Sequence, residues 1–273
     1  MSNKFRILGV SAGAIAVVLG AAVALVASAD HAWGPYHWAR TANSFTLNLG
    51  DNVSSGWDGY LAAASGDWSL SNVLDTAIVA GGTNNVKGRN TPKNCVPTNG
   101  RVEVCNAKYG TNGWLGIASV WASGEHIVQG TVKMNDTYFN TAKYNNASWK
   151  QFVVCQEVGH TFGLDHQDEN FGNLNLGTCM DYTNDPDGSL LGQLGNTHPN
   201  QHDYDMIETI YAHLDATTTV SPQAPSSLPE IDHSDPSSWG KGIRHSGDGR
   251  VSLYERNLGN GNKVFTFVIW ATK

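Results

Sequence analysis

Residues 156–166 read Gln-Glu-Val-Gly-His-Thr-Phe-Gly-Leu-Asp-His. On a helix, residues four positions apart share a face, so Gln156 and His160 can both reach one metal ion. The adjacent Glu157 can then reach a water bound to that ion. A buried helix whose histidines make only structural hydrogen bonds is the competing interpretation, and the complete spacing disfavours it.

The rest of the stretch extends this pattern beyond the helix. Gly163 permits a positive φ that a residue with a Cβ resists, so the chain can leave the helix and bring His166 back as a third ligand. Three protein ligands leave one tetrahedral position for water. The spacing therefore predicts a catalytic metal site rather than a closed structural one.

The stretch resembles HExxHxxGxxH, the long signature of zinc peptidases, at each fixed position except the first, where Gln156 replaces a histidine. Downstream, residues 179–182 read Cys-Met-Asp-Tyr, which is similar to the Met-turn of the metzincin clan. The resemblance implies that Met180 forms an apolar floor beneath the metal. It also implies that Tyr182 approaches the metal or the oxyanion of the substrate.

The resemblance covers residues 40 to 214 and is closest to the matrixin subgroup of the metzincins. It implies an α+β fold over residues 30–215, with a twisted mixed sheet, an active-site helix, a Met-turn and a C-terminal helix, followed by a small β tail. The implied reaction is hydrolysis of peptide bonds, with Zn2+ activating a water and Glu157 acting as general base. The implied substrate is an extended peptide or protein that pairs with strand 126–134 as the sheet edge.

Gln156 departs from the family pattern, because an amide oxygen is a weaker zinc donor than an imidazole nitrogen. Three readings remain open. Gln156 ligates through oxygen, another residue or a water replaces the donor, or the metal is lost. The main expectation is a secreted zinc endopeptidase, and the alternative is a catalytically weak or inactive secreted binding protein with the same fold.

The N-terminal segment, residues 1–29, has the features of a signal peptide. Lys4 and Arg6 precede an apolar stretch, and Ala27-Ser28-Ala29 is a small-residue cleavage site. A retained membrane anchor is the alternative. Cleavage removes two basic and no acidic residues. It leaves 15 Lys and Arg against 24 Asp and Glu, so the net charge shifts from −7 to −9. Such a chain is not expected to bind nucleic acid, and its oligomeric state stays open.

The four cysteines fit two disulfide bonds in an oxidising compartment. Cys95 and Cys105 flank a turn-rich stretch and can close one loop. Cys155 precedes the metal-binding residues and Cys179 lies in the Met-turn, so a bridge would join two parts of the site. Three pairings are possible, and the sequence does not choose among them.

Hydrophobic patterning predicts the other elements. We expect strands at 45–49, 78–80, 115–121 and 126–134, helices at 57–68 and 204–214, and a long loop at 83–113. Ser148 resembles the start of a capping box, which would begin the metal helix near residue 149 and carry it to Gly163.

Several other residues are candidate ligands. Hard oxygen donors for Ca2+ are available at Asp168, Glu169, Asp185 and Asp187, but the spacing of a calcium loop is missing, so solvated turns are favoured. His126 is a further metal-ligand candidate, and His198 or His202 can replace the missing donor. These histidines are more readily explained as solvated or helix-entry residues.

The C-terminal part divides in two. Residues 216–246 are rich in Ser, Thr and Pro and predict a linker. Residues 247–273 predict a β-hairpin-like segment with strands at 251–256 and 263–270. Because residues 264–270 are apolar, they must pack either on the catalytic domain or on a partner.

Overall fold

The computed structural model describes residues 31–82, 93–220, 228–229 and 231–272. Its strands are β1 (His37–Trp38), β2 (Phe45–Asn52), β3 (Leu74–Ala80), β4 (Arg101–Ala107), β5 (Trp114–Ser123), β6 (His126–Asn135), β7 (Lys241–His245), β8 (Val251–Gly259) and β9 (Asn262–Trp270). The helices are α1 (Asp58–Trp68), α2 (Asp136–Phe139), α3 (Ala147–His160), α4 (Gln201–Ile210) and the 3-10 helix η2 (Pro236–Trp239). A strand-rich sheet with few helices is compatible with the expected α+β class.

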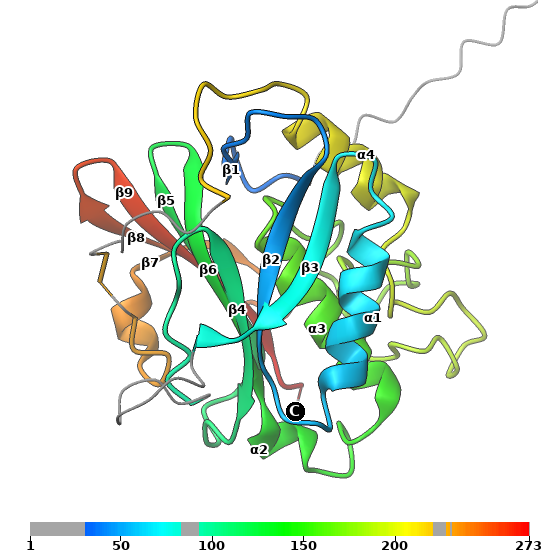
Figure 1. The fold of residues 1–273 in the computed structure, drawn as a ribbon. Coiled ribbons are helices and arrows are strands. Elements are labelled where there is room, and N and C mark those ends of the chain that lie inside the picture. Colours follow the sequence, from blue (N-terminus) through cyan, green and yellow to red (C-terminus); the bar gives the residue numbers. More distant parts are fainter. Residues whose placement is uncertain (1–30, 83–92, 221–227, 230, 273) are drawn as a thin grey trace, which may run out of the picture.

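The strands form one mixed sheet in the order β3-β2-β4-β6-β5-β9-β8-β7, and β1 adds to β6 (Figure 1). β3, β2, β4 and β6 run parallel to one another. Each following strand is antiparallel to the one before it. The expectation that strand 126–134 is the sheet edge is wrong, because β6 is paired with β4 on one side and β5 on the other.

Helices α1 and α3 pack together on one face of the sheet (Figure 1). The main core lies between them and the sheet and includes the fully buried Trp38, Trp68 and Phe152. A second cluster on the opposite face of β5 and β9 contains Trp121 and Trp239. The strands β5 and β9 are therefore covered on both faces.

The prediction of a long loop at 83–113 is wrong for Arg101–Ala107, which form the internal strand β4. Residues 83–92 lie outside the described residues. A buried acid in the strand breaks the hydrophobic alternation: Glu103 accepts hydrogen bonds from Arg101 Nε and Asn52 Nδ2, both at 2.7 Å. Cys95 is disulfide-bonded to Cys105 in this strand.

Helix α3, which carries the motif, begins and ends earlier than expected. Asn146, not Ser148, caps it, since the Asn146 side chain accepts a hydrogen bond from Trp149 N at 3.0 Å. The helix ends at His160 and a turn follows. Gly163 has φ +105°, and a Cβ there would lie 2.7 Å from Tyr36 O, so both conformation and space require glycine.

The closing helix α4 also starts earlier than the expected residue 204. Asn200 and Asp203 form a reciprocal capping box at its N-terminus. None of the helices among the described residues is long and apolar enough to cross a membrane. The expected signal peptide, residues 1–29, lies outside the described residues.

The C-terminal segment extends the sheet of the same chain. β8 and β9 are antiparallel and joined by a tight turn, and β9 pairs with β5 along nearly its whole length. The expected linker 216–246 includes η2 and β7, with Trp239 fully buried. Residues 264–270 thus pack on their own chain, which resolves the question left by the sequence.

Candidate metal centre

The residues of the motif meet at the C-terminal end of α3. His160 is the last residue of the helix and is fully buried. Its Nδ1 lies 2.9 Å from Leu164 O, a carbonyl acceptor, so Nδ1 carries the hydrogen. Its Nε2 has no hydrogen-bond partner in the described structure. Burial is the largest cause that holds the pKa of His160 well below its usual value.

His166 shows the same arrangement. The turn at Gly163 returns the chain, and the imidazole ring of His166 lies 4.5 Å from that of His160, centroid to centroid. Its Nδ1 faces Glu169 Oε1 at 2.7 Å, and its buried Nε2 has no partner among the described residues. Glu169 in turn accepts a hydrogen bond from Ser252 Oγ on β8 at 3.0 Å.

Gln156 is held by residues 179–182, the segment expected to form a Met-turn. Its Nε2 donates a hydrogen bond to Cys179 O at 2.8 Å, which fixes the orientation of the amide. The other amide atom, Oε1, is buried without a partner in the described residues. The disulfide bond between Cys155 and Cys179 ties this carbonyl to the helix, and it is one of the three pairings that the sequence allowed.

Glu157 is fully buried beside these residues. Neither carboxyl oxygen has a well-formed hydrogen bond among the described residues. Burial raises the pKa of Glu157 well above its usual value, and the nearby backbone N–H groups of Ile269 and Ala118 oppose this more weakly. Space for the side chain comes from Gly116 in β5, where a Cβ would lie 2.7 Å from Glu157 Oε1.

The two Met-turn residues contact the motif directly. A Cβ on Gly159 in α3 would lie 2.7 Å from Met180 Sδ, so Met180 packs closely against the helix. The ring of Tyr182 lies 4.4 Å from that of His166. Its hydroxyl donates a hydrogen bond to Val268 O on β9 at 3.1 Å.

Strand β9 covers this cluster. The ring of Phe267 stacks on that of His160, with centroids 4.1 Å apart and planes within 10°. Phe267 is directly paired with Ala118 in β5. Sequence reasoning named neither Phe267 nor Gly116, because both lie on strands whose place in the sheet is set by long-range pairing.

The polar atoms without partners fit a divalent metal ion. Two imidazoles that each use Nδ1 for a hydrogen bond and keep Nε2 free are oriented as metal ligands usually are, with the second-shell partner fixing the tautomer. The amide oxygen of Gln156 adds an oxygen donor. A buried polar atom without a partner costs free energy, and binding of an ion would remove that cost for these three residues.

A group formed by Asp165, His166 and Glu169 has ligand atoms within 4.8 Å of one another. Here it is the Nδ1 side of His166 that faces the carboxylates, and Asp165 is ion-paired with Arg244. This group is therefore a hydrogen-bond network that orients His166. Sequence reasoning considered Glu169 only as a calcium ligand, although its position three residues after His166 allows this contact.

The other expected ligands do not join the site. Asp168, Asp185 and Asp187 belong to no group of metal-ligating side chains in the described part of the chain. His198 Nδ1 pairs with Asp67 Oδ2 at 2.7 Å, and the ring of His202 stacks on that of His31. Neither histidine therefore supplies the imidazole nitrogen that is missing because residue 156 is Gln.

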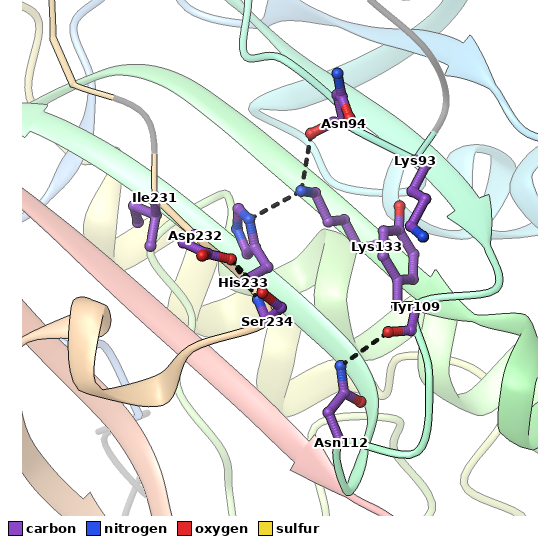
Figure 2. A pocket seen from close by; sticks show the side chains of 9 residues that line it. All are labelled: Lys93, Asn94, Tyr109, Asn112, Lys133, Ile231, Asp232, His233 and Ser234. Carbon is purple, nitrogen blue, oxygen red and sulfur yellow. Dashed lines mark hydrogen bonds between the residues drawn. The ribbon is translucent and has the colours of Figure 1, made fainter.

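A pocket of about 330 Å³ lies apart from this centre, and Figure 2 shows its lining. Lys133 Nζ donates to Asn94 O at 2.9 Å and faces His233 Nδ1 at 2.8 Å. His233 Nε2 lies 3.0 Å from Ser119 Oγ. Burial, followed by the charge of Lys133, holds the pKa of His233 well below its usual value.

Comparison of the chain with protein-family models gives no match, and comparison with curated proteins gives none either.

Proposed function

We propose that this chain is a zinc-dependent endopeptidase of the metzincin type, exported from the cell. In this proposal His160, His166 and Gln156 hold the metal and Glu157 is the general base. The observation that carries it is the matched state of the two buried histidines, each with Nδ1 hydrogen-bonded and Nε2 free. The two disulfide bonds support an oxidising compartment.

Zinc bound there would lower the pKa of a bound water and polarise the carbonyl of the scissile peptide. Glu157 would take the proton of the attacking water and pass it to the leaving amine. Its carboxyl group has no well-formed hydrogen bond among the described residues, although the backbone N–H groups of Ile269 and Ala118 lie near it. Gln156 would bind through Oε1, because its Nε2 is committed to Cys179 O.

The position of β9 leads us to propose that the enzyme is latent. An extended peptide is held by the free N–H and C=O groups of an edge strand. β5 is the strand next to Glu157, through Gly116, and its outer side is occupied by β9. A substrate would therefore pair with β5 rather than with β6, and only after β9 has left.

Zinc content of the purified protein tests the metal site. We expect a tightly bound zinc that His160→Ala loses and Glu157→Gln retains. Peptide hydrolysis should be measured in a chain whose β9 is loosened, and Glu157→Gln should lower it at least about 100-fold. A wild-type chain that holds no zinc at α3 would sink the peptidase proposal.

The inactive binding protein remains the second candidate, since the proposed ligands and Glu157 are buried and Phe267 of β9 stacks on His160. Zinc binding without hydrolysis, even with β9 loosened, would favour it. Because the metal test and the hydrolysis test are separate, the two candidates are distinguishable.

A further inference from the structure

A second cluster of histidines lies away from α3. His37 is in β1, and His126 is the first residue of β6 and its direct partner in the sheet. His213 and Asp215 follow α4. Three segments that are far apart in the sequence thus bring three imidazoles and one carboxylate together.

The Nε2 atoms of these histidines converge on one oxygen. Asp215 Oδ1 lies 3.3 Å from His37 Nε2, 3.2 Å from His126 Nε2 and 3.7 Å from His213 Nε2. His213 Nε2 lies 3.2 Å from His37 Nε2. Ligands at zinc distances in a tetrahedral site are about 3.3 Å apart, and the printed separations are close to that length. His37, His126 and Asp215 form a group whose ligand atoms all lie within 4.8 Å of one another, and His213 lies beside this group.

Hydrogen positions explain why a cation suits the cluster. His37 Nδ1 lies 2.8 Å from Pro35 O and carries a hydrogen, so in the neutral ring Nε2 presents a lone pair. That lone pair faces both Asp215 Oδ1 and His213 Nε2. A divalent cation would accept lone pairs from His37, His126 and Asp215 at once.

The surroundings hold the ligands in place. Asp215 Oδ2 accepts a hydrogen bond from Arg40 N at 2.9 Å, and Asp215 N donates to Arg40 O at 2.8 Å. The side chains of His37 and Asp215 are 5% and 9% exposed, whereas those of His126 and His213 are 39% and 56% exposed. His37 and Asp215 are thus held in the interior, while His126 and His213 face solvent, and an ion can reach the cluster from their side.

We propose that His37, His126 and Asp215 form a second zinc site, which the exposed side chain of His213 completes by a small movement. Three imidazoles and a carboxylate suit borderline divalent ions, zinc first among those commonly available. With His213 as the fourth ligand no position stays open, so the ion would be structural. It would fasten the N-terminal segment and the chain after α4 to the turn between β5 and β6. This proposal does not depend on the peptidase proposal.

The test is zinc stoichiometry on the full-length chain after chelator treatment and titration with zinc. We expect two equivalents for the wild type and one for His126→Gln combined with His213→Gln. His160→Ala should also leave one, and combining all three substitutions should leave none. His198→Ala is the matched control, because it removes a solvent-exposed histidine paired with a carboxylate outside the cluster.

A second readout is independent of catalysis. In the His160→Ala background, zinc should raise the melting temperature by several degrees, and Co2+ should give the spectrum of a tetrahedral site. Both effects should vanish when His126→Gln and His213→Gln are added. Unchanged stoichiometry in the chain with both substitutions would overturn the second site, whereas unchanged stoichiometry in His160→Ala would overturn only the site at α3. The two exposed histidines can be replaced without burying a polar group, so misfolding does not obscure the result.

Discussion

If β9 keeps the proposed peptidase latent, Phe265→Ala is expected to release peptide hydrolysis by loosening β9. Phe265 is buried on β9, two residues from the ring that covers His160. Its own contacts are elsewhere: the ring centroid lies 4.7 Å from that of Trp33 and 4.5 Å from that of Tyr36. The substitution therefore weakens the docking of β9 without touching a proposed ligand or the general base.

The size of the effect follows from burial. Replacing a buried Phe by Ala costs about 3–5 kcal/mol. These contacts are lost when β9 leaves β5, so most of that cost lowers the free energy of opening. Since about 1.4 kcal/mol changes an equilibrium tenfold, the open population should rise on the order of 100-fold or more. Peptide hydrolysis should rise by the same factor until the open form dominates.

The assay combines turnover of a fluorogenic peptide mixture, in the presence of zinc, with hydrogen exchange of the β9 amides. The matched control is Phe139→Ala in α2, because Phe139 is equally buried and its ring packs on those of Trp57, at 4.8 Å, and Tyr144 rather than on a ring of β9. Both variants should lose similar global stability, and only Phe265→Ala should gain activity. Adding Glu157→Gln to Phe265→Ala should abolish the gain.

Faster exchange of the β9 amides in Phe265→Ala without any hydrolysis would refute the proposed latency. Equal activation by Phe139→Ala would show that general destabilisation, rather than release of β9, is responsible. If Phe265→Ala unfolds, Phe265→Leu keeps part of the contact area and should show a smaller rise in both readouts.

Gln156→His should raise the zinc affinity of the α3 site in chelator competition, because imidazole nitrogen is the better donor, and no gain would argue against Gln156 as a ligand. Replacing Cys155 and Cys179 by Ala should lower the free energy of unfolding by about 3 kcal/mol, because the disulfide closes a loop of 24 residues. The same change should speed the loss of zinc from the α3 site, and an equal effect of removing the Cys95–Cys105 disulfide would contradict this. Acid should destabilise the fold through His233, because burial and the charge of Lys133 hold its pKa in the folded state well below the usual value. Below the unfolded-state pKa of about 6.5, the unfolded chain binds a proton that the folded chain does not, so the free energy of unfolding falls by about 1.4 kcal/mol per pH unit until His233 also titrates in the folded state. In His233→Gln the midpoint of denaturant unfolding should depend less on pH than in the wild type. An unchanged dependence would show that His233 does not cause the acid sensitivity.

Local sequence patterns anticipated most of the elements near the candidate site. The expected strands at 45–49, 115–121, 126–134 and 263–270 correspond to β2, β5, β6 and β9, since alternation and turn residues report the period of a strand. The pattern does not predict β4 because Glu103 is buried in it, held by hydrogen bonds from Arg101 in the same strand and from the distant Asn52. Helix starts were misplaced because Asn146 and Asn200 cap them earlier than the expected starts.

The sequence by itself determined the spacing of Gln156, Glu157, His160 and His166, because helix period and a positive φ at Gly163 are local properties. It could not determine that β6 is internal, that β9 pairs with β5 and covers His160, or that His37, His126 and Asp215 meet. Those results come from strand pairing and packing between segments that are separated in the sequence, by as much as 178 residues for His37 and Asp215. Many registers satisfy the same local pattern, and only the complete fold, with both faces of the sheet buried, selects one of them.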